Sequence, residues 1–560
     1  MIGITTPAFA ANIPPGQEPG AQGERVYQQF EQRKELLGKK KVKAPEIEVE
    51  KPKGAAAPSA ATFLLKEISV TGSTVFKPQD LRPTYQAYLD KKISFQDLDE
   101  ITKKIEDRYV RKGYLTTTVF VPEQDIKGGK VEVKVVEGRL GKVTVEGNRW
   151  FSRALIEKFL HIKKEEPLNM PRLQKDILRL NQNPDLEIKT FIQAGEVTGT
   201  SDIVLRAKEN VPYHIGAGFD NQGTRLTGKN RTSFYLRSSN LTGHFDSFFA
   251  SNILSADTVG VSSSYDLPLD TRGTMIGMDM TYFTMTLGKE LRSFHVTGTT
   301  QIYSPHISKE LYLSESFQAN ASAGMEIKVI KKKIAGAITT NDQLRLPYFG
   351  FDLNKTDLFG GGGETTFSPQ FTFGTSRFLG ASTRNHPSAS RDGTGGFFFN
   401  YTQNLRRMQR MFLKSYMAIR SVFQVSPYTL PSSEQCQLGG INTVRGYPEG
   451  DYMADIGGNI STDWMFPAYF IPERWKLPKA DVPLRSQIEP FVFLDVGMGK
   501  LNKTLQGERE HKFLMGSGGG VQLHFRKNLY VRAQWAKALG DDPTSGAGAS
   551  TFYITCQVEI

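Results

Sequence analysis

The sequence predicts two small α+β modules followed by an all-β transmembrane barrel of about 16 antiparallel strands. Three observations lead to this fold class. A β-α-α-β-β order of elements occurs twice between residues 63 and 210. From residue 211 onward the helical period disappears, and segments alternate between apolar and polar residues. Glycine, phenylalanine and tyrosine are abundant, with 53, 36 and 20 residues, although hydrophobic residues make up only 39%.

Length and charge narrow the class of protein. At 560 residues the chain is longer than one compact soluble domain usually is. No run of about 18 apolar residues occurs, which excludes a transmembrane helix, whereas barrel strands need only every second residue to be apolar. The formal net charge is +12, but Lys and Arg are scattered along the chain. Nucleic acid is therefore not a predicted partner.

The N-terminal region predicts a helix on a tether. Ala8 and Ala10 have the small-residue spacing of a signal-peptidase site, so residues 1–10 are interpreted as the remainder of a signal peptide. Residues 24–38 predict a mostly polar helix that ends at a glycine. Residues 39–62 are rich in Pro, Ala, Lys and Glu, which is linker composition. The alternative is that helix and linker form a disordered tail.

The first module is predicted over residues 63–137. Pro78 opens a short helix, and Ser94 with Asp97 forms a capping box before a longer helix. Gly113 ends the longer helix. Two strands follow, over residues 114–121 and 130–136.

The second module, residues 138–210, repeats this order. Pro171 starts its second helix, and two strands follow, over residues 186–192 and 201–207. Each sheet leaves at least one edge free, and a free edge accepts an extended chain through backbone hydrogen bonds. The alternative is that both modules are rigid spacers. The candidate partner-binding residues are Tyr114, Thr116 and Thr118 in the first module and Leu186, Ile188 and Phe191 in the second.

The barrel is predicted over residues 211–560. Phe317 to Val329 alternate strictly between apolar and polar residues, as strands with one lipid-facing side do. Roughly 350 residues, at about 22 per strand with its connection, give about 16 strands. In the last strand Cys556 belongs to the apolar face, so no bridge to Cys436 is expected. The same alternation occurs over residues 232–236, 276–282, 456–466, 488–496, 521–525, 529–535 and 552–560.

Two short motifs are candidates for the functional site. Val444-Arg445-Gly446-Tyr447 lies in a long connection, residues 427–454, and Phe493-Leu494-Asp495-Val496-Gly497 lies on a later strand. By alternation Asp495 faces the lumen together with Phe493. If the loop folds inward, Arg445 can pair with this carboxylate through two hydrogen bonds. Gly446 would permit a tight turn beside which Tyr447 packs. The alternative for Arg445 is a solvated surface position.

No catalytic chemistry emerges from the sequence. The eight histidines are isolated, without paired metal-binding spacing, and no phosphate-binding or nucleophile motif occurs. We therefore predict no catalytic residue, no metal site, no cofactor and no enzyme activity.

Two tandem modules, a barrel, V-R-G-Y in a late loop and F-x-D-x-G on a following strand resemble the Omp85 superfamily. More narrowly, they resemble the two-partner secretion transporters, the TpsB family of the haemolysin and filamentous-haemagglutinin type. The resemblance covers nearly the whole chain after residue 62. It implies that the modules are POTRA domains in the periplasm of a Gram-negative bacterium and that the barrel lies in the outer membrane.

The resemblance also implies a function. The modules would capture the N-terminal secretion domain of a large exoprotein, and the barrel would export it without nucleotide, in type V secretion. The helix at residues 24–38 would plug the pore. Other expected partners are outer-membrane lipid and the barrel-assembly machinery for insertion. The alternatives are an Omp85-type assembly and insertion factor, against which the N-terminal helix and the presence of only two modules argue, and a passive porin, which leaves the modules without a purpose.

Overall fold

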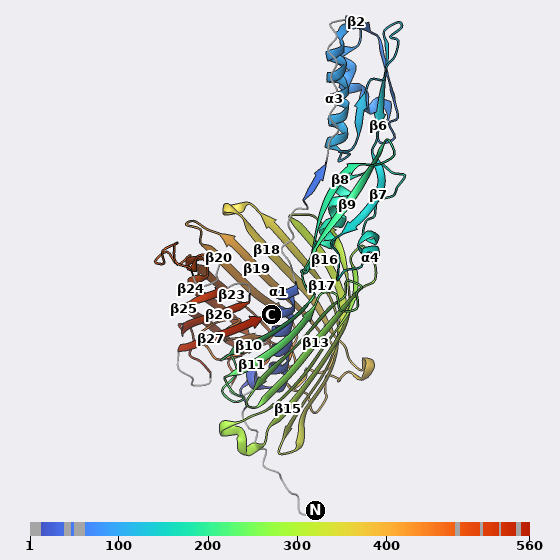
Figure 1. Cartoon of the computed structure of the whole chain (residues 1–560). Helices are drawn as coiled ribbons and strands as arrows, with labels where there is room; N and C mark the ends of the chain where they lie inside the picture. Colours follow the sequence, from blue (N-terminus) through green and yellow to red (C-terminus); the bar gives the residue numbers. More distant parts are fainter. Residues whose placement is uncertain are drawn as a thin grey trace, which may run out of the picture. The chain divides into compact units, whose positions relative to one another are not determined.

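The computed structural model describes residues 13–38, 46–49, 62–476, 482–504, 508–525, 528–544 and 550–560 (Figure 1). The predicted signal-peptide remainder at residues 1–10 lies outside the described residues. The chain forms two compact units, one of residues 39–211 and one that combines residues 1–38 with residues 212–560. Among the described residues, no helix has the length and apolarity to cross a membrane.

The first module packs two helices on a three-stranded sheet of order β3-β6-β5, with β3 parallel and β5 antiparallel to β6. Its long helix begins at the predicted capping box, because the Ser94 hydroxyl accepts a hydrogen bond from the Asp97 N–H (3.3 Å) and the Asp97 carboxylate accepts one from the Ser94 N–H (2.7 Å). The elements are β2 (Thr62–Leu65), β3 (Glu67–Thr71), α2 (Pro78–Tyr85), β4 (Lys91–Ser94), α3 (Phe95–Arg111), β5 (Thr118–Phe120) and β6 (Lys130–Val136).

The strand β5 is shorter than predicted. Tyr114 and Thr116 precede it in an irregular segment, and Thr118 is its first residue. The Tyr114 ring packs edge-on against Tyr109 of α3, with ring centroids 6.3 Å apart. Packing against the helix therefore holds Tyr114 away from the sheet ladder, which alternation alone cannot reveal.

The second module repeats this arrangement, but its sheet has four strands, in the order β1-β8-β9-β7. The additional strand β1 (Ile47–Val49) comes from the predicted linker and pairs parallel with β8, Ile47 opposite Thr190. The edge of β8 that the sequence predicted to be free is therefore occupied by the chain itself. The other elements are β7 (Arg139–Glu146), α4 (Arg153–Lys158), α5 (Met170–Leu180), β8 (Leu186–Ala194) and β9 (Thr200–Glu209).

The remaining long strands close into one antiparallel barrel, in which β10 pairs with β27. This confirms the predicted barrel of about 16 strands. The wall consists of β10 (Tyr213–Asp220), β11 (Arg231–Ser238), β12 (Ser247–Ser255), β13 (Thr258–Pro268), β14 (Thr274–Thr286), β15 (Thr297–Leu313), β16 (Phe317–Ile334), β17 (Ala337–Asp357), β18 (Gly363–Gly374), β19 (Phe398–Arg410), β20 (Tyr416–Val425), β23 (Ile456–Met465), β24 (Ile488–Lys500), β25 (His511–Phe525), β26 (Leu529–Ala538) and β27 (Ser550–Glu559).

The two faces of the wall follow the predicted alternation. On β24, Val492 and Leu494 are exposed on the outer face, whereas Phe493 and Asp495 are buried inside. Cys436 and Cys556 are not bridged. Because β20 runs in the same direction as β10, the loop that follows β20 lies at the end of the barrel opposite to the start of β10.

The N-terminal helix α1 (Pro19–Gly38) lies inside the barrel and contacts the wall from β12 to β16 (Figure 1). It ends at Gly38 as predicted but begins at Pro19 rather than at Glu24. Proline is favoured in the first turn of a helix because its fixed φ suits that position and its missing N–H is not needed there. A short 3₁₀ turn, η1 (Pro15–Gln17), precedes it.

Candidate functional site inside the barrel

The loop between β20 and β23, residues 426–455, turns into the lumen. Its two arms pair as a short antiparallel stalk of β21 (Cys436–Leu438) and β22 (Tyr452–Ala454). Beyond the stalk lies the tip with the Val-Arg-Gly-Tyr motif. Arg445 is 1% exposed there and its predicted partner Asp495 is fully buried.

Arg445 meets Asp495 through three hydrogen bonds. Its Nε and Nη2 donate to the two carboxylate oxygens at 2.7 and 2.6 Å, and its backbone N–H donates at 2.9 Å. The guanidinium also lies over the Phe493 ring, 3.5 Å from the centroid. This is the bidentate geometry in which arginine binds carboxylates best, completed by a cation–π contact.

Two further wall residues complete the arginine's surroundings. Nη2 of Arg445 donates to Asp463 of β23 at 2.5 Å, and Nη1 donates to Gln534 of β26 at 3.1 Å. We call Arg445, Asp463, Asp495 and Gln534 the latch. Asp463 also accepts a hydrogen bond from Arg532 at 2.8 Å, so the latch continues into a buried charge network. Asp463 and Gln534 were not predicted, because their only signal in the sequence is their place in an alternating strand.

The glycine and the tyrosine of the motif fit the tip against the wall. Gly446 has φ +98°, and a Cβ there would lie 2.6 Å from the Ala538 N. Only glycine suits this turn. The Tyr447 hydroxyl accepts a hydrogen bond from the Gly540 N–H at 3.0 Å, and the Tyr553 hydroxyl donates to the Tyr447 carbonyl at 3.3 Å.

Glycines of the wall make room for the tip. A Cβ on Gly497 would lie 2.7 Å from Val444, and one on Gly516 would lie 1.9 Å from the Arg445 carbonyl oxygen. The glycine of the F-x-D-x-G motif is therefore the surface on which Val444 rests. Gly516, on the neighbouring strand β25, has the same role for Arg445 and was not predicted.

Ion pairs fix α1 to the barrel wall along its length. Near its N-terminal end, Glu18 pairs with Lys332 at 2.9 Å, close to the turn between β16 and β17. Near its C-terminal end, Lys34 pairs with Asp279 at 2.9 Å. Aromatic side chains pack between these points, with Phe30 against Phe249 at 5.2 Å between ring centroids. The helix therefore runs through the lumen from the end that carries the inward loop towards the opposite end.

The helix also contacts the inward loop. Arg25 Nη2 donates to Gln437 Oε1 at 2.8 Å, and Gln437 Nε2 donates to the Ala21 carbonyl at 2.6 Å. Lys328 of the wall pairs with Glu24 of the helix at 2.8 Å and with Glu434 of the loop at 2.9 Å. Helix, loop and wall thus share one network of buried charges.

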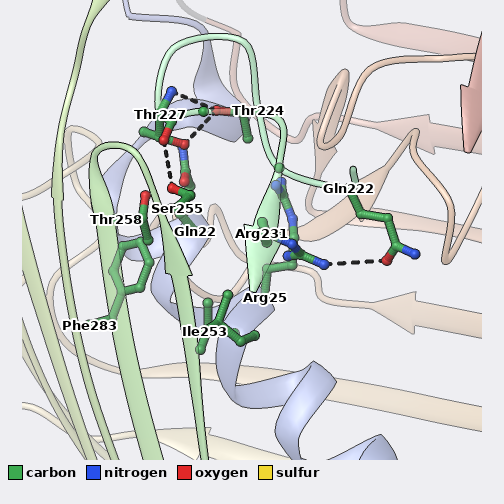
Figure 2. A pocket seen from close by; sticks show the side chains of 13 residues that line it. Gln22, Arg25, Gln222, Thr224, Thr227, Arg231, Ile253, Ser255, Thr258 and Phe283 are labelled. Carbon is green, nitrogen blue, oxygen red and sulfur yellow. Dashed lines mark hydrogen bonds between the residues drawn. The ribbon is translucent and has the colours of Figure 1, made fainter. Parts of the chain in front are cut away.

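One cavity beside the helix is small. A cavity of about 30 Å³ lies between α1 and the loop from β10 to β11, lined by Gln22, Arg25 and Arg231 among others (Figure 2). A volume of this size has room for a water molecule or two but not for an extended polypeptide. Within the described ranges, no group of three or more His, Cys, Asp or Glu side chains has metal-site geometry.

The predicted partner-binding residues belong to the unit of residues 39–211, whereas the latch belongs to the unit that contains the barrel. In the second module Leu186 and Ile188 are buried in the core. The Arg206 guanidinium lies over the Phe191 ring, 4.2 Å from the ring centroid. In the first module Thr118 lies on β5, an edge strand of its sheet.

The barrel, the inward loop and the first module are those of a secretion protein with a POTRA domain, as two family models show. Residues 63–138 match the ShlB-type POTRA domain. Residues 199–523 match the family of haemolysin secretion/activation proteins ShlB/FhaC/HecB, and the chain belongs to this family.

Several relatives are similar in sequence over most of the chain. The outer membrane transporter CdiB of Dickeya dadantii is 25% identical over 496 residues, which cover 85% of this chain and 84% of that protein. The heme/hemopexin transporter protein HuxB of Haemophilus influenzae is 21% identical over 477 residues, 84% of this chain and 82% of that protein. The solved structure of CdiB from Escherichia coli has the same fold, with a TM-score of 0.70, 19% identity and coverage of 97% and 98%.

Members of this family are two-partner secretion transporters, and this chain is an outer-membrane exporter of an exoprotein. The POTRA domain lies in the periplasm in these family members. The predicted family, localisation and function are therefore confirmed, and the alternatives of an assembly factor and a porin are not supported. Family members are transporters, not enzymes.

Proposed function

We propose that export proceeds through a gated pore in which α1 is the plug, the latch holds the inward loop and two POTRA domains capture the exoprotein. The observation that carries this proposal is the position of α1 inside the closed barrel, paired with wall residues near both of its ends. At about 1.5 Å per residue its 20 residues measure about 30 Å, close to the height of the apolar band of a membrane barrel.

Internal repetition supports a second POTRA domain at residues 138–210. In the first module Gly72 has φ +81° and the Glu137 carboxylate accepts hydrogen bonds from the N–H groups of Thr74 (2.8 Å) and Val75 (2.9 Å). In the second module Gly147 has φ +79°, and Glu209 accepts hydrogen bonds from the N–H groups of Arg149, at 2.8 Å, and of Trp150, at 2.6 Å. Each glycine directly follows a strand that is parallel to a second strand, and the glutamate lies at the end of this second strand, as its last residue (Glu209) or the next one (Glu137).

Capture of the exoprotein uses sheet edges. A strand of its N-terminal secretion domain adds to β5 beside Tyr114, Thr116 and Thr118, or to β8 along the backbone of Leu186, Ile188 and Phe191. At β8 the incoming strand has to displace β1 and the preceding Glu46, whose carbonyl accepts a hydrogen bond from the Thr190 N–H at 3.1 Å. Because β1 lies between α1 and the first module in sequence, displacement at this edge also loosens the tether of the plug.

The latch holds the tip of the inward loop in the lumen at rest. Both partners of the Arg445–Asp495 pair are shielded from water, and loss of one partner of such a pair costs about 3 to 5 kcal/mol. Phe493, Gly497, Val444, Gly446 and Tyr447 shape the contact around it. No cofactor and no nucleotide take part in this scheme.

The outer face of the barrel contacts outer-membrane lipid. Val492, Leu494 and Trp535 are about half exposed on that face, as expected for side chains surrounded by hydrocarbon. Insertion of such a barrel is a task for the barrel-assembly machinery.

Deletion of α1 tests the plug. We expect removal of residues 19–38 from the otherwise complete chain to raise the resting conductance in planar bilayers several-fold, because the lumen loses the body that fills it. Lys34→Gln, which removes the pair with Asp279, should increase the frequency of opening. Leu36→Gln is the matched control, since Leu36 is 62% exposed. Unchanged conductance after the deletion would exclude α1 as the plug.

A further inference from the structure

The base of the inward loop carries a second set of buried contacts, separate from the latch. It lies where the loop leaves and rejoins the barrel wall, next to the stalk of β21 and β22. Asp455 is the last residue before β23 and is fully buried. Its carboxylate, Arg391 and Asn502 are here called the neck anchor.

The Asp455 carboxylate accepts hydrogen bonds from four donors. Oδ1 of Asp455 accepts hydrogen bonds from the Leu430 N–H (3.0 Å), and Oδ2 accepts one from the Asn502 N–H (2.9 Å). Oδ1 also accepts from Gln435 Nε2 at 3.1 Å and from Arg391 Nη1 at 3.2 Å. Leu430 and Gln435 belong to the outgoing arm of the loop, so Asp455 joins the beginning of the loop to its end.

The other two residues of the neck anchor, Arg391 and Asn502, connect it to the neighbouring loops. Arg391, from the loop between β18 and β19, donates to the Lys503 carbonyl at 2.8 Å in the loop between β24 and β25. Asn502 Nδ2 donates to the carbonyls of Ser426 and Tyr428, both at 2.8 Å. Three loops at the same end of the barrel are therefore held together at Asp455.

The neck anchor and the latch share no residue. The latch joins the tip to the strands β23, β24 and β26, whereas the neck anchor joins the base to two loops. The stalk lies between them, with Cys436 opposite Ala454 and both side chains in one buried cluster. Release of Arg445 from Asp495 therefore breaks none of the contacts of Asp455.

We propose that Asp455 is the positioning residue of a fixed anchor, which stays closed while the exoprotein passes and confines the movement of the loop to its tip. The inference rests on the proposed function, in which plug and latch release. The physical reason is which parts the contacts join. Opening the base breaks the hydrogen bonds of Asp455 that hold three loops to one another, whereas release of the tip breaks contacts between the tip and the barrel wall only.

A single substitution can lock the stalk and test this. Opposite residues of an antiparallel pair have Cα atoms about 4.5 to 5.5 Å apart, within the range that a disulfide spans, so Ala454→Cys places a second thiol against Cys436. We expect the oxidised variant to export a partner exoprotein at the level of the same variant after reduction. Cys436→Ser combined with Ala454→Cys is the control for the oxidant. Export that stops on oxidation and returns on reduction would overturn the fixed anchor, yet leave the plug and the export function untouched.

Asp455→Asn tests the residue itself. We expect a several-fold higher resting conductance and faster proteolysis of the 426–455 loop, while heat-modifiable migration still shows a folded barrel. Asp392→Asn is the matched control, because Asp392 pairs with Lys503 on the surface, 81% exposed. In Asp455→Asn with Ala454→Cys, oxidation should restore the low conductance and reduction should remove it again. Wild-type conductance and protease resistance in Asp455→Asn, or a defect that oxidation leaves unchanged, would refute the role of Asp455.

Discussion

At the scale of the residue, Arg445 joins three strands of the barrel through one side chain. Its partners Asp463, Asp495 and Gln534 come from β23, β24 and β26. A guanidinium with almost no contact to water is stable only when its donors are satisfied in this way. The inward position of the loop tip therefore depends on this residue.

Arg445→Ala should abolish or sharply reduce export while the barrel still inserts. The change leaves two buried carboxylates with less compensation, at a cost of about 3 to 5 kcal/mol. Arg445→Lys should also be impaired, because an ammonium cannot form the two parallel hydrogen bonds. Export is measured by the exoprotein in the medium and insertion by heat-modifiable migration. Arg272→Ala, at an exposed turn, is the control, and wild-type secretion by a stably inserted Arg445→Ala would contradict the role of the latch.

Gly516→Ala should displace the tip without changing any charge. The new methyl group would lie 1.9 Å from the Arg445 carbonyl oxygen, so either the loop or the strand has to move, at about 1 to 3 kcal/mol. We expect faster proteolysis of the loop and reduced export. Gly350→Ala serves for comparison, since its nearest neighbour would be 3.3 Å away. Equal behaviour of the two variants would show that the tip does not depend on this contact.

Some residues of the site could be predicted from the sequence and others could not. Asp495 was predictable because its neighbours Val492 and Leu494 are apolar, which fixes the lumen face of β24. Asp463 was not predicted, since β23 carries polar residues at several successive inward positions and a carboxylate there can equally face water in the lumen. Glycines such as Gly516 become meaningful only when the approach of another backbone is known.

At the scale of the element, the barrel strands were predictable because their period of two extends over ten or more residues. The three-residue strand β1 was not, because so short a strand has no period, and its conformation depends on the edge of β8 against which it lies. The residues 39–45 and 50–61 of the predicted linker lie outside the described residues. In β5, packing of Tyr114 against α3 overrides a sequence that favours an extended strand.

Glu137→Ala and Glu209→Ala should destabilise their modules to similar extents. Each glutamate accepts hydrogen bonds from successive backbone N–H groups in the turn after the glycine, and each loss should cost about 1 to 3 kcal/mol. The measurement is urea unfolding of the fragment 39–211. Glu196→Ala, in the exposed turn between β8 and β9, is the control. A large effect at one glutamate and none at the other would argue against two equivalent POTRA domains.

At the scale of the whole molecule, residues 39–211 form a compact unit of their own. In the proposed scheme this unit captures the exoprotein, and the unit that contains the barrel lets it pass. In the sequence, β1 lies between α1 and the two modules. In the proposed scheme this order couples binding of the exoprotein to release of α1 from the barrel.

The fragment 39–211 should fold in solution and bind an isolated secretion domain. A fragment that starts at residue 62 lacks β1, and we expect it to bind several-fold more tightly, because no backbone hydrogen bonds at β8 have to be broken first. Isothermal titration calorimetry measures both affinities. Val197→Lys, 68% exposed between β8 and β9, controls for surface charge. Identical affinities of the two fragments would remove the β8 edge from the proposed binding site.

The pairing of β10 with β27 has a consequence for biogenesis. These strands lie at opposite ends of the barrel sequence, and Glu559 strengthens their seam by accepting hydrogen bonds from Tyr235 at 2.9 Å and Arg237 at 3.0 Å. Until β27 arrives, the growing sheet keeps two open edges, whose backbone groups cannot be satisfied in hydrocarbon. Partial insertion is therefore unfavourable while these edges have no partner, and closure of the seam between β10 and β27 satisfies both edges at once.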